Sequence, residues 1–162
     1  MATMTNPLWV EYRRHWLRPL LERRGRLIAT SLPVTMWPPA VLAGEKKECY
    51  RNALTVTLRL PGRFVYCEGL AERISVNVVA EHGWIFDRES GAVIDPTWGA
   101  DGRDFAGVGF SSDFIQRQIS KRTRLPFLFW EGSEADSEIL AGIVVITSGA
   151  PVKFPASHHS PE

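Results

Sequence analysis

The sequence predicts an α+β fold in which N-terminal helices precede an antiparallel sheet. Two stretches with helix-like hydrophobic periodicity, residues 7–24 and 45–60, come first. Three runs rich in valine, isoleucine and aromatic residues follow in close succession, at residues 63–71, 74–87 and 92–98. We expect these three runs to form strands of an antiparallel meander.

The first helical stretch, residues 7–24, places leucine and aromatic side chains on one face. It contains Pro19, which should kink the helix or divide it in two. Residues 25–44 are rich in proline, glycine and alanine, and we therefore expect them to form a connecting loop.

The second helical stretch, residues 45–60, is closed by Pro61 and Gly62. Beyond the strands, residues 107–124 are expected to form a loop that leads into a further helix. Ser111 is among the residues that offer an N-cap for that helix.

Length and composition indicate one domain. The chain has 162 residues, of which 44% are hydrophobic and 23% charged, which is ordinary for a globular protein with a sizeable core. We expect a single domain over residues 1–150, in which an N-terminal helix and loop (1–44) precede the part that carries the candidate site (45–150). A disordered tail should follow over residues 151–162. The net charge of +1 gives no reason to expect a nucleic acid or an acidic membrane as partner.

The cysteine content favours a reducing compartment. The two cysteines, Cys49 and Cys67, stand in unlike contexts, which suggests reduced thiols; a regulatory disulfide between them is the minor alternative. The first residues contain no apolar run of signal-peptide length. No segment approaches the roughly 18 apolar residues that a membrane span needs. We therefore expect a cytoplasmic protein.

Cys49 is the candidate nucleophile. It lies near the start of the predicted helix 45–60, where the positive end of the helix dipole and unpaired backbone N–H groups favour a thiolate. Lys46 and Lys47 add positive charge. The alternative is a buried structural cysteine, which is common for a cysteine considered alone.

His82 and Asp95 are expected to share one face of the sheet. Residues 88–91 (RESG) are typical of a turn, and pairing the flanking strands around it puts Trp84 opposite Asp95 and His82 opposite Thr97. Asp95 then lies two residues from the partner of His82, within reach of a hydrogen bond to the imidazole. A slip of one residue would place Asp95 on the other face.

Four short motifs occur in order along residues 45–120. They are Cys49-x-x-Asn52, Tyr66-x-Glu68-Gly69, His82-x-Trp84 and Asp95-Pro96-Thr97. Together they resemble the transglutaminase-like branch of the papain-like superfamily, and also a family of uncharacterised bacterial and phage proteins. The resemblance implies a papain/transglutaminase-like core in which Cys49 is the nucleophile, His82 the general base and Asp95 the residue that orients the base.

One feature of papain-type enzymes is missing. In those enzymes a glutamine, which binds the oxyanion, lies shortly before the cysteine. Residues 42–45 of this chain are LAGE and include no glutamine. The oxyanion would then be stabilised by the backbone N–H of Cys49 and a second donor, for which Asn52 and Tyr50 are the candidates.

Other residues allow two interpretations. Glu68 is expected either to line the cleft or to face solvent from its strand. Trp84, a candidate cleft residue, and Trp98 are expected in the core or in the cleft wall. Cys49, Cys67, His82 and Asp95 could together bind zinc, but they lack the short paired spacing of structural zinc sites. We therefore expect neither a metal nor another cofactor.

These observations lead to three functional hypotheses. The first is a cysteine hydrolase or acyltransferase that acts on an amide of a peptide, isopeptide or carboxamide through a thioester. The second is a catalytically silent papain-like module that binds a protein partner. The third is nucleic-acid association through residues 11–26, which contain six arginines and only two glutamates. Such a stretch is more often the solvated face of a helix.

Overall fold

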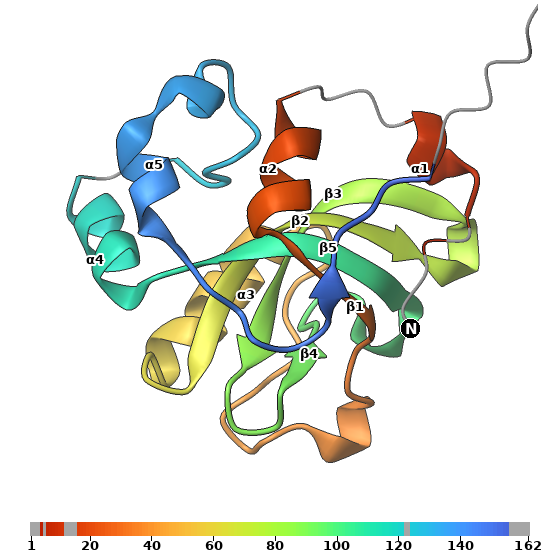
Figure 1. Cartoon of the computed structure of the whole chain (residues 1–162). Helices are drawn as coiled ribbons and strands as arrows, with labels where there is room; N and C mark the ends of the chain where they lie inside the picture. Colours follow the sequence, from red (N-terminus) through yellow and green to blue (C-terminus); the bar gives the residue numbers. More distant parts are fainter. Residues whose placement is uncertain (1–3, 5, 12–15, 122–123, 156–162) are drawn as a thin grey trace, which may run out of the picture.

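A seven-stranded antiparallel sheet forms the centre of the molecule (Figure 1). This computed structural model describes residues 4, 6–11, 16–121 and 124–155. The strand order is β4-β3-β2-β5-β1-β7, and β6 pairs with β5. The strands are β1 (Arg26–Thr30), β2 (Phe64–Arg73), β3 (Val78–Asp87), β4 (Ala92–Ile94), β5 (Gly102–Phe110), β6 (Ile143–Val144) and β7 (Ala150–Pro151).

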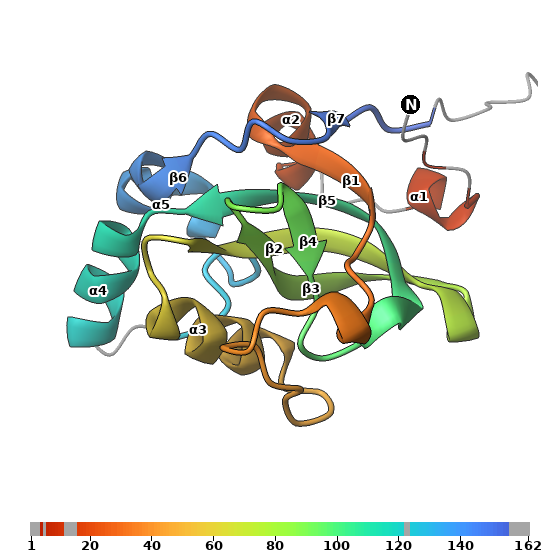
Figure 2. The same ribbon diagram turned by 90° about the horizontal axis from the view of Figure 1, so that it is seen from below.

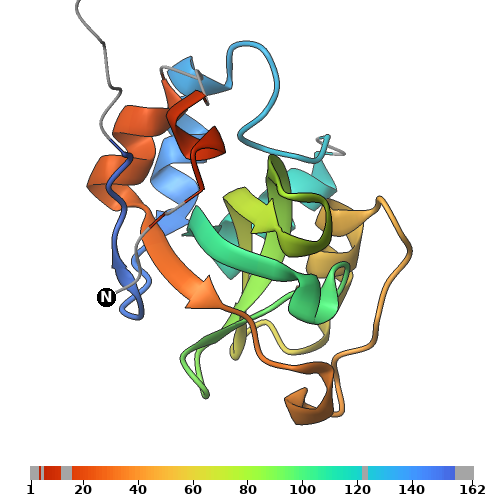
Figure 3. The ribbon, with the colours of Figure 1, turned by 90° about the vertical axis from the view of Figure 1, so that its right-hand side faces the viewer.

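Helices surround the sheet. The α-helices are α1 (Leu8–Glu11), α2 (Leu17–Arg24), α3 (Cys49–Arg59), α4 (Ser112–Ser120) and α5 (Ser137–Gly142). In the view of Figure 2, α2 lies above the strands and α3 below them. The segment between β1 and α3 passes along the same lower side, and Figure 3 shows it from another direction. The α+β class with an antiparallel sheet is therefore confirmed.

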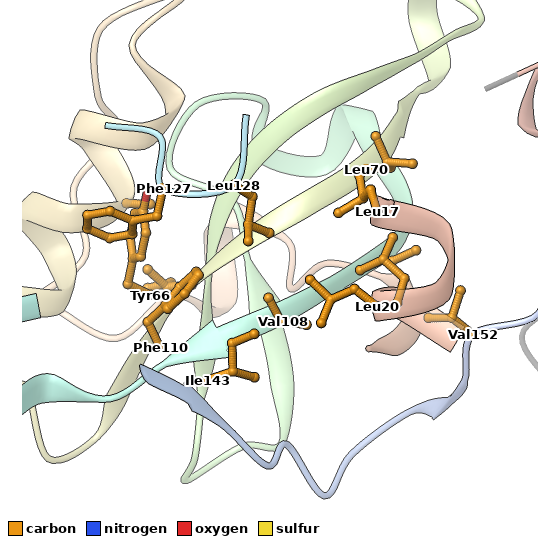
Figure 4. Close-up of a cluster of buried hydrophobic side chains, with 14 of the residues drawn as sticks. Leu17, Leu20, Tyr66, Leu70, Val108, Phe110, Phe127, Leu128, Ile143 and Val152 are labelled. Carbon is orange, nitrogen blue, oxygen red and sulfur yellow. The ribbon is translucent and has the colours of Figure 1, made fainter. Parts of the chain in front are cut away.

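Side chains alternate between two apolar clusters, one on each face of the sheet. The larger cluster joins the outer face to the helices: Figure 4 shows Leu17 and Leu20 of α2 packed toward Leu70 of β2 and Val108 of β5. The smaller cluster includes Cys67, Trp84 and Val93. Directly after β1, the backbone N–H of Leu32 donates to the carbonyl of Val93 in β4 (2.8 Å). The sheet is therefore curled so far that the chain after β1 contacts the edge strand β4.

The expectation that Pro19 kinks or divides the helix is wrong, because Pro19 lies in the first turn of the continuous helix α2. Two helices, α1 and α2, stand in place of one, and residues 12–15 between them lie outside the described residues. Pro19 itself is the third residue of α2. A backbone N–H at that position has no partner within the helix, so a proline there costs no hydrogen bond.

The loop expectation for residues 25–44 is wrong at its beginning, because β1 occupies Arg26–Thr30 and pairs with β5 and β7. The prolines that suggested a loop all follow this strand. The expectation for residues 107–124 is wrong in the same way, since β5 runs to Phe110. The expected disordered tail is also corrected at residue 151, which belongs to β7, while residues 156–162 lie outside the described residues.

The starts of two helices, α3 and α4, can be compared with the sequence expectations, and α3 carries a site residue. The helix expected over residues 45–60 begins at Cys49, so residues 45–48 belong to the preceding loop. Helix α4 has the expected cap, since the Ser111 hydroxyl accepts a hydrogen bond from the N–H of Phe114 (3.1 Å). The hairpin of β3 and β4 brings the remaining site residues next to α3.

Candidate active site

Cys49 is the first residue of α3, and its side chain is half-buried. The helix is held against the sheet by the buried side chains of Ala53 and Val56. A Cβ on Gly83 would lie 2.7 Å from Cδ1 of Tyr50, so glycine is required at this point of β3 for the first turn of α3 to approach it. The thiol therefore stands at the positive end of a helix dipole, beside the middle of β3.

His82 and Asp95 are joined by a buried hydrogen bond. His82 lies in β3, and Asp95 follows β4 directly. The hairpin pairs Ile85 with Ile94 and Asp87 with Ala92, which is the register expected from a turn at residues 88–91. The His82 Nε2 atom lies 2.7 Å from Oδ2 of Asp95, and both side chains are at most 1% exposed.

The Asp95 carboxylate is held by its own turn. Its Oδ1 accepts hydrogen bonds from the backbone N–H groups of Thr97 and Trp98, both at 3.0 Å. This arrangement leaves Oδ2 for the imidazole. The indole of Trp98 stacks on the His82 ring, with centroids 3.6 Å apart and planes 11° from parallel. The ring of His82 is therefore fixed by a hydrogen bond at its edge and by stacking on its face.

The electrostatics favour a protonated His82. Burial lowers the pKa of His82, but the carboxylate of Asp95 and hydrogen bonds with Asp95 and Cys49 outweigh it and raise the pKa to about 9. Because Nε2 is bonded to Asp95, Nδ1 is the ring nitrogen left to interact with Cys49. An imidazolium at this position stabilises a neighbouring thiolate. The structure thus brings Cys49, His82 and Asp95 together from one helix and one hairpin.

Asn52 does not serve as an oxyanion donor, contrary to the expectation. Its amide nitrogen donates to the carbonyl of Glu45 (2.7 Å) and to the hydroxyl of Thr97 (2.8 Å), so both amide hydrogens are used. The side chain is 7% exposed. Asn52 joins the loop before α3 to the loop after β4.

Glu68 neither lines an open cleft nor faces solvent. It is fully buried and accepts hydrogen bonds from the Tyr66 hydroxyl (2.7 Å) and from the backbone N–H groups of Phe127 (2.7 Å) and Leu128 (2.8 Å). Burial raises the pKa of Glu68 to about 7, although these three hydrogen bonds lower it. The carboxylate therefore fastens the loop around residue 127 to the sheet.

Trp84 and Tyr50 lie in different surroundings. Trp84 is 3% exposed and belongs to the smaller apolar cluster, so its place is the core. Tyr50 lines a cavity of about 370 Å³ beside the first turn of α3, together with Lys47, Glu48, Arg51 and Leu125. The two neighbours of Cys49 in the chain both line this cavity, whereas Cys49 and His82 are not among its lining residues.

Two contributors to the site, Thr97 and Trp98, have no assigned catalytic role in the sequence prediction. The sequence places Trp98 in the core or cleft wall and gives Thr97 a pairing position and a place in the Asp95-Pro96-Thr97 motif, without a role. Both follow Asp95 in one turn, and an aspartate whose carboxylate accepts N–H groups two and three residues further on is a known local pattern. That pattern could have indicated Thr97, whereas the stacking of Trp98 on His82 depends on tertiary structure.

The zinc alternative lacks a ligand set. Among the residues that the structure describes, no three His, Cys, Asp or Glu side chains converge to hold a metal ion. Cys49 and Cys67 are both free thiols, and Cys67 is buried. In the same described ranges, no helix is long and apolar enough to cross a bilayer.

The arginine-rich stretch is partly engaged within the chain. Arg18 pairs with Glu22 (3.3 Å), Arg24 donates to the carbonyl of Leu140 (3.0 Å), and Arg26 donates to the carbonyl of Gly149 (2.9 Å). Residues 13 and 14 lie outside the described residues. Arg18 and Arg24 belong to α2 and Arg26 begins β1, so these three guanidinium groups have partners within the chain.

No protein-family model, curated protein or solved structure matches the chain. The resemblance to the papain-like superfamily therefore remains a prediction from the four motifs. The site has to be interpreted from its own geometry.

The two thiols should differ sharply in reactivity. Cys67 is fully buried, and burial raises the pKa of its thiol well above the ordinary value. We expect iodoacetamide to modify the folded protein once, at Cys49, and the protein unfolded in urea twice. Intact-mass spectrometry with peptide mapping measures both numbers. The Cys49→Ala variant should take up no label while folded; labelling of Cys67 in the folded protein would contradict the structure.

Stability should depend on pH through His82. Its pKa is about 9 in the folded protein and near 6.5 in the unfolded chain, so the folded state binds the extra proton between these values. This contribution to stability is fully present below about pH 6.5 and is lost as the pH rises through about 9. Urea unfolding across this range should show the free energy of unfolding falling. The fall should be much smaller in Asp95→Asn; equal slopes in the two proteins would refute the assignment.

Proposed function

We propose that the protein is a cysteine hydrolase or acyltransferase that cleaves an amide through a thioester on Cys49. The observation that supports this most directly is the continuous contact from Asp95 through His82 to Cys49, with a 2.7 Å hydrogen bond at its buried end. A nucleophile, a base and a group that orients the base are the components that thiol-based acyl transfer needs.

The proposed reaction has two halves. The Cys49 thiolate attacks the carbonyl carbon of the amide, and the carbon–nitrogen bond breaks as the His82 imidazolium gives its proton to the leaving amine. Water or a second amine then attacks the thioester while His82 takes the proton of the incoming group. The carbon–sulfur bond breaks, and the product leaves the Cys49 thiolate beside the His82 imidazolium, as at the start. Because the first half needs an imidazolium, the rate with amide donors should fall as the pH rises through about 9.

The oxyanion is assigned to the start of α3. Backbone N–H groups in the first turn of a helix have no partner within the helix, and they point toward its positive end. We propose the N–H of Cys49 as one donor, because it belongs to the attacking residue itself. Asn52 is no candidate for the second donor, since both of its amide hydrogens are already bonded.

A silent binding module is the alternative. It would be favoured by a Cys49 sulfur that is shut off from solvent or distant from the His82 ring. The residue Cys49 is instead half-buried, and its side chain interacts with His82. A cavity lined by Glu48 and Tyr50 lies at the first turn of α3, the helix that begins at Cys49. These observations support catalysis over binding alone.

The test is to trap the acyl-enzyme. We expect incubation with p-nitrophenyl acetate at neutral pH to add one acetyl group to Cys49, detected by intact mass and located by peptide mapping. Neutral hydroxylamine should remove this group, because it cleaves thioesters and leaves acetyl-lysine intact. The matched control is Cys49→Ala, which should show no hydroxylamine-sensitive adduct. The absence of such an adduct on the native protein, or its presence in the variant, would overturn the proposal.

A further inference from the structure

We propose that Asn52 and Thr97 are positioning residues, which hold the Cys49 thiol against the His82–Asp95 pair. This inference rests on the proposed function. The nucleophile belongs to α3, whereas the base and its partner belong to the β3–β4 hairpin. Their relative placement therefore depends on what joins the helix to the hairpin.

Asn52 supplies the helix side of this link. It lies three residues after Cys49, which puts it close to the same face of α3 one turn further on. Its amide oxygen accepts from the N–H of Glu45 (3.2 Å), and its amide nitrogen donates to the carbonyl of the same residue (2.7 Å). This pair of hydrogen bonds fixes the loop that leads into Cys49.

Thr97 supplies the hairpin side. Its hydroxyl accepts the second amide hydrogen of Asn52 (2.8 Å), and its backbone N–H donates to Oδ1 of Asp95 (3.0 Å). The other oxygen of Asp95 binds His82. A chain of hydrogen bonds thus runs from α3 through Asn52, Thr97 and Asp95 to the imidazole that faces Cys49.

Gly44 shows that the loop is shaped around this amide. A Cβ on residue 44 would lie 2.1–2.5 Å from three side-chain atoms of Asn52, closer than real contacts allow. The N–H of Gly44 also donates to the carbonyl of Pro96 (2.9 Å), next to Thr97. The segment from Gly44 to Asn52 and the turn after Asp95 are therefore joined by two hydrogen bonds, Gly44 to Pro96 and Asn52 to Thr97.

The expected consequence is a loss of reactivity without a loss of fold. A misplacement of about 1 Å in a catalytic site can cost about 10²-fold in rate. Thr97→Val removes the hydroxyl and keeps the shape, so we expect the alkylation of Cys49 by iodoacetamide at pH 6 to slow by about tenfold, toward the rate expected without activation by His82. Thr97→Ser keeps the hydroxyl and should stay within a few-fold of the native rate. Asn52→Ala should resemble Thr97→Val.

Thr57→Val is the matched control. Thr57 is buried on the same helix, and its hydroxyl bonds only within the helix, to the carbonyl of Ala53 (2.8 Å). The Thr57→Val variant should have a lower melting temperature than the native protein and an unchanged rate of Cys49 alkylation. An unchanged rate in Thr97→Val, or an equal loss in Thr57→Val or Thr97→Ser, would overturn the inference. If Asn52→Ala does not fold, the rates of Thr97→Val and Thr97→Ser still test whether the Asn52–Thr97 hydrogen bond positions the thiol. A native Cys49 that reacts no faster than glutathione would instead overturn the proposed function.

Discussion

Asp95→Asn should lower the rate at which p-nitrophenyl acetate acetylates Cys49 by at least about tenfold while leaving the fold intact. Oδ1 of Asp95 already accepts two backbone N–H groups, from Thr97 and Trp98. An asparagine would keep its oxygen at that position and therefore turn its NH₂ group toward Nε2 of His82. The imidazole would then have to accept at Nε2 and carry its proton on Nδ1, the nitrogen that has to take the proton of the thiol. The substitution thus selects the wrong tautomer.

The measurement for this prediction is the rate of acetylation of Cys49 by p-nitrophenyl acetate at neutral pH, with circular dichroism as a check on the fold. Asp136→Asn is the matched control, because Asp136 caps α5 and asparagine caps a helix about as well as aspartate does. The control should react at close to the native rate. A loss of less than about tenfold in Asp95→Asn would show that the carboxylate does not orient the base.

Glu68→Gln should lower the free energy of unfolding by about 2–4 kcal/mol and the melting temperature by roughly 5–15 °C. Both carboxylate oxygens accept a backbone N–H, from Phe127 and Leu128. A glutamine has one oxygen, so its NH₂ group must face one of these N–H groups, and two buried donors are left without an acceptor. Each such group costs about 1–3 kcal/mol.

Urea and thermal unfolding measure this effect. The exposed Glu134→Gln is the control and should change stability by less than about 0.5 kcal/mol. Glu68 touches neither His82 nor Asp95 in its hydrogen bonds, so alkylation of Cys49 well below the melting temperature should stay within a few-fold of native. If Glu68→Gln is as stable as the native protein, Glu68 does not hold the loop around residue 127 to the sheet. A large loss of Cys49 reactivity would place Glu68 in the site.

The hairpin could be predicted from the sequence because its determinants are local. A turn-forming segment between two apolar runs fixes the register, and the register fixes which side chains share a face. The observed pairing of Ile85 with Ile94 follows from this alone. The position of Asp95 relative to His82 then needs no knowledge of the rest of the chain.

The errors have a common cause in contacts between distant segments. Strand β5 contains Gly107 and Gly109, which weaken a strand pattern, yet a Cβ at either position would meet Trp84 or Val65 at 2.5–2.6 Å. The sequence predicts Asn52 as an oxyanion donor and Glu68 either in the cleft or facing solvent. Neither holds, because partners of these side chains lie 45 and about 60 residues away in the chain. No local pattern reveals that these polar side chains are already satisfied.

The activation of Cys49 by His82 is the central claim, and its most direct test is one rate constant. The measurement is the second-order rate of iodoacetamide alkylation of Cys49 at pH 6, compared with glutathione under the same conditions and with the His82→Ala variant. We predict that native Cys49 reacts at least about tenfold faster than glutathione, and that His82→Ala reduces the rate to that of glutathione. Equal rates for native Cys49 and glutathione, or no change on removing the imidazole, would contradict the proposed mechanism.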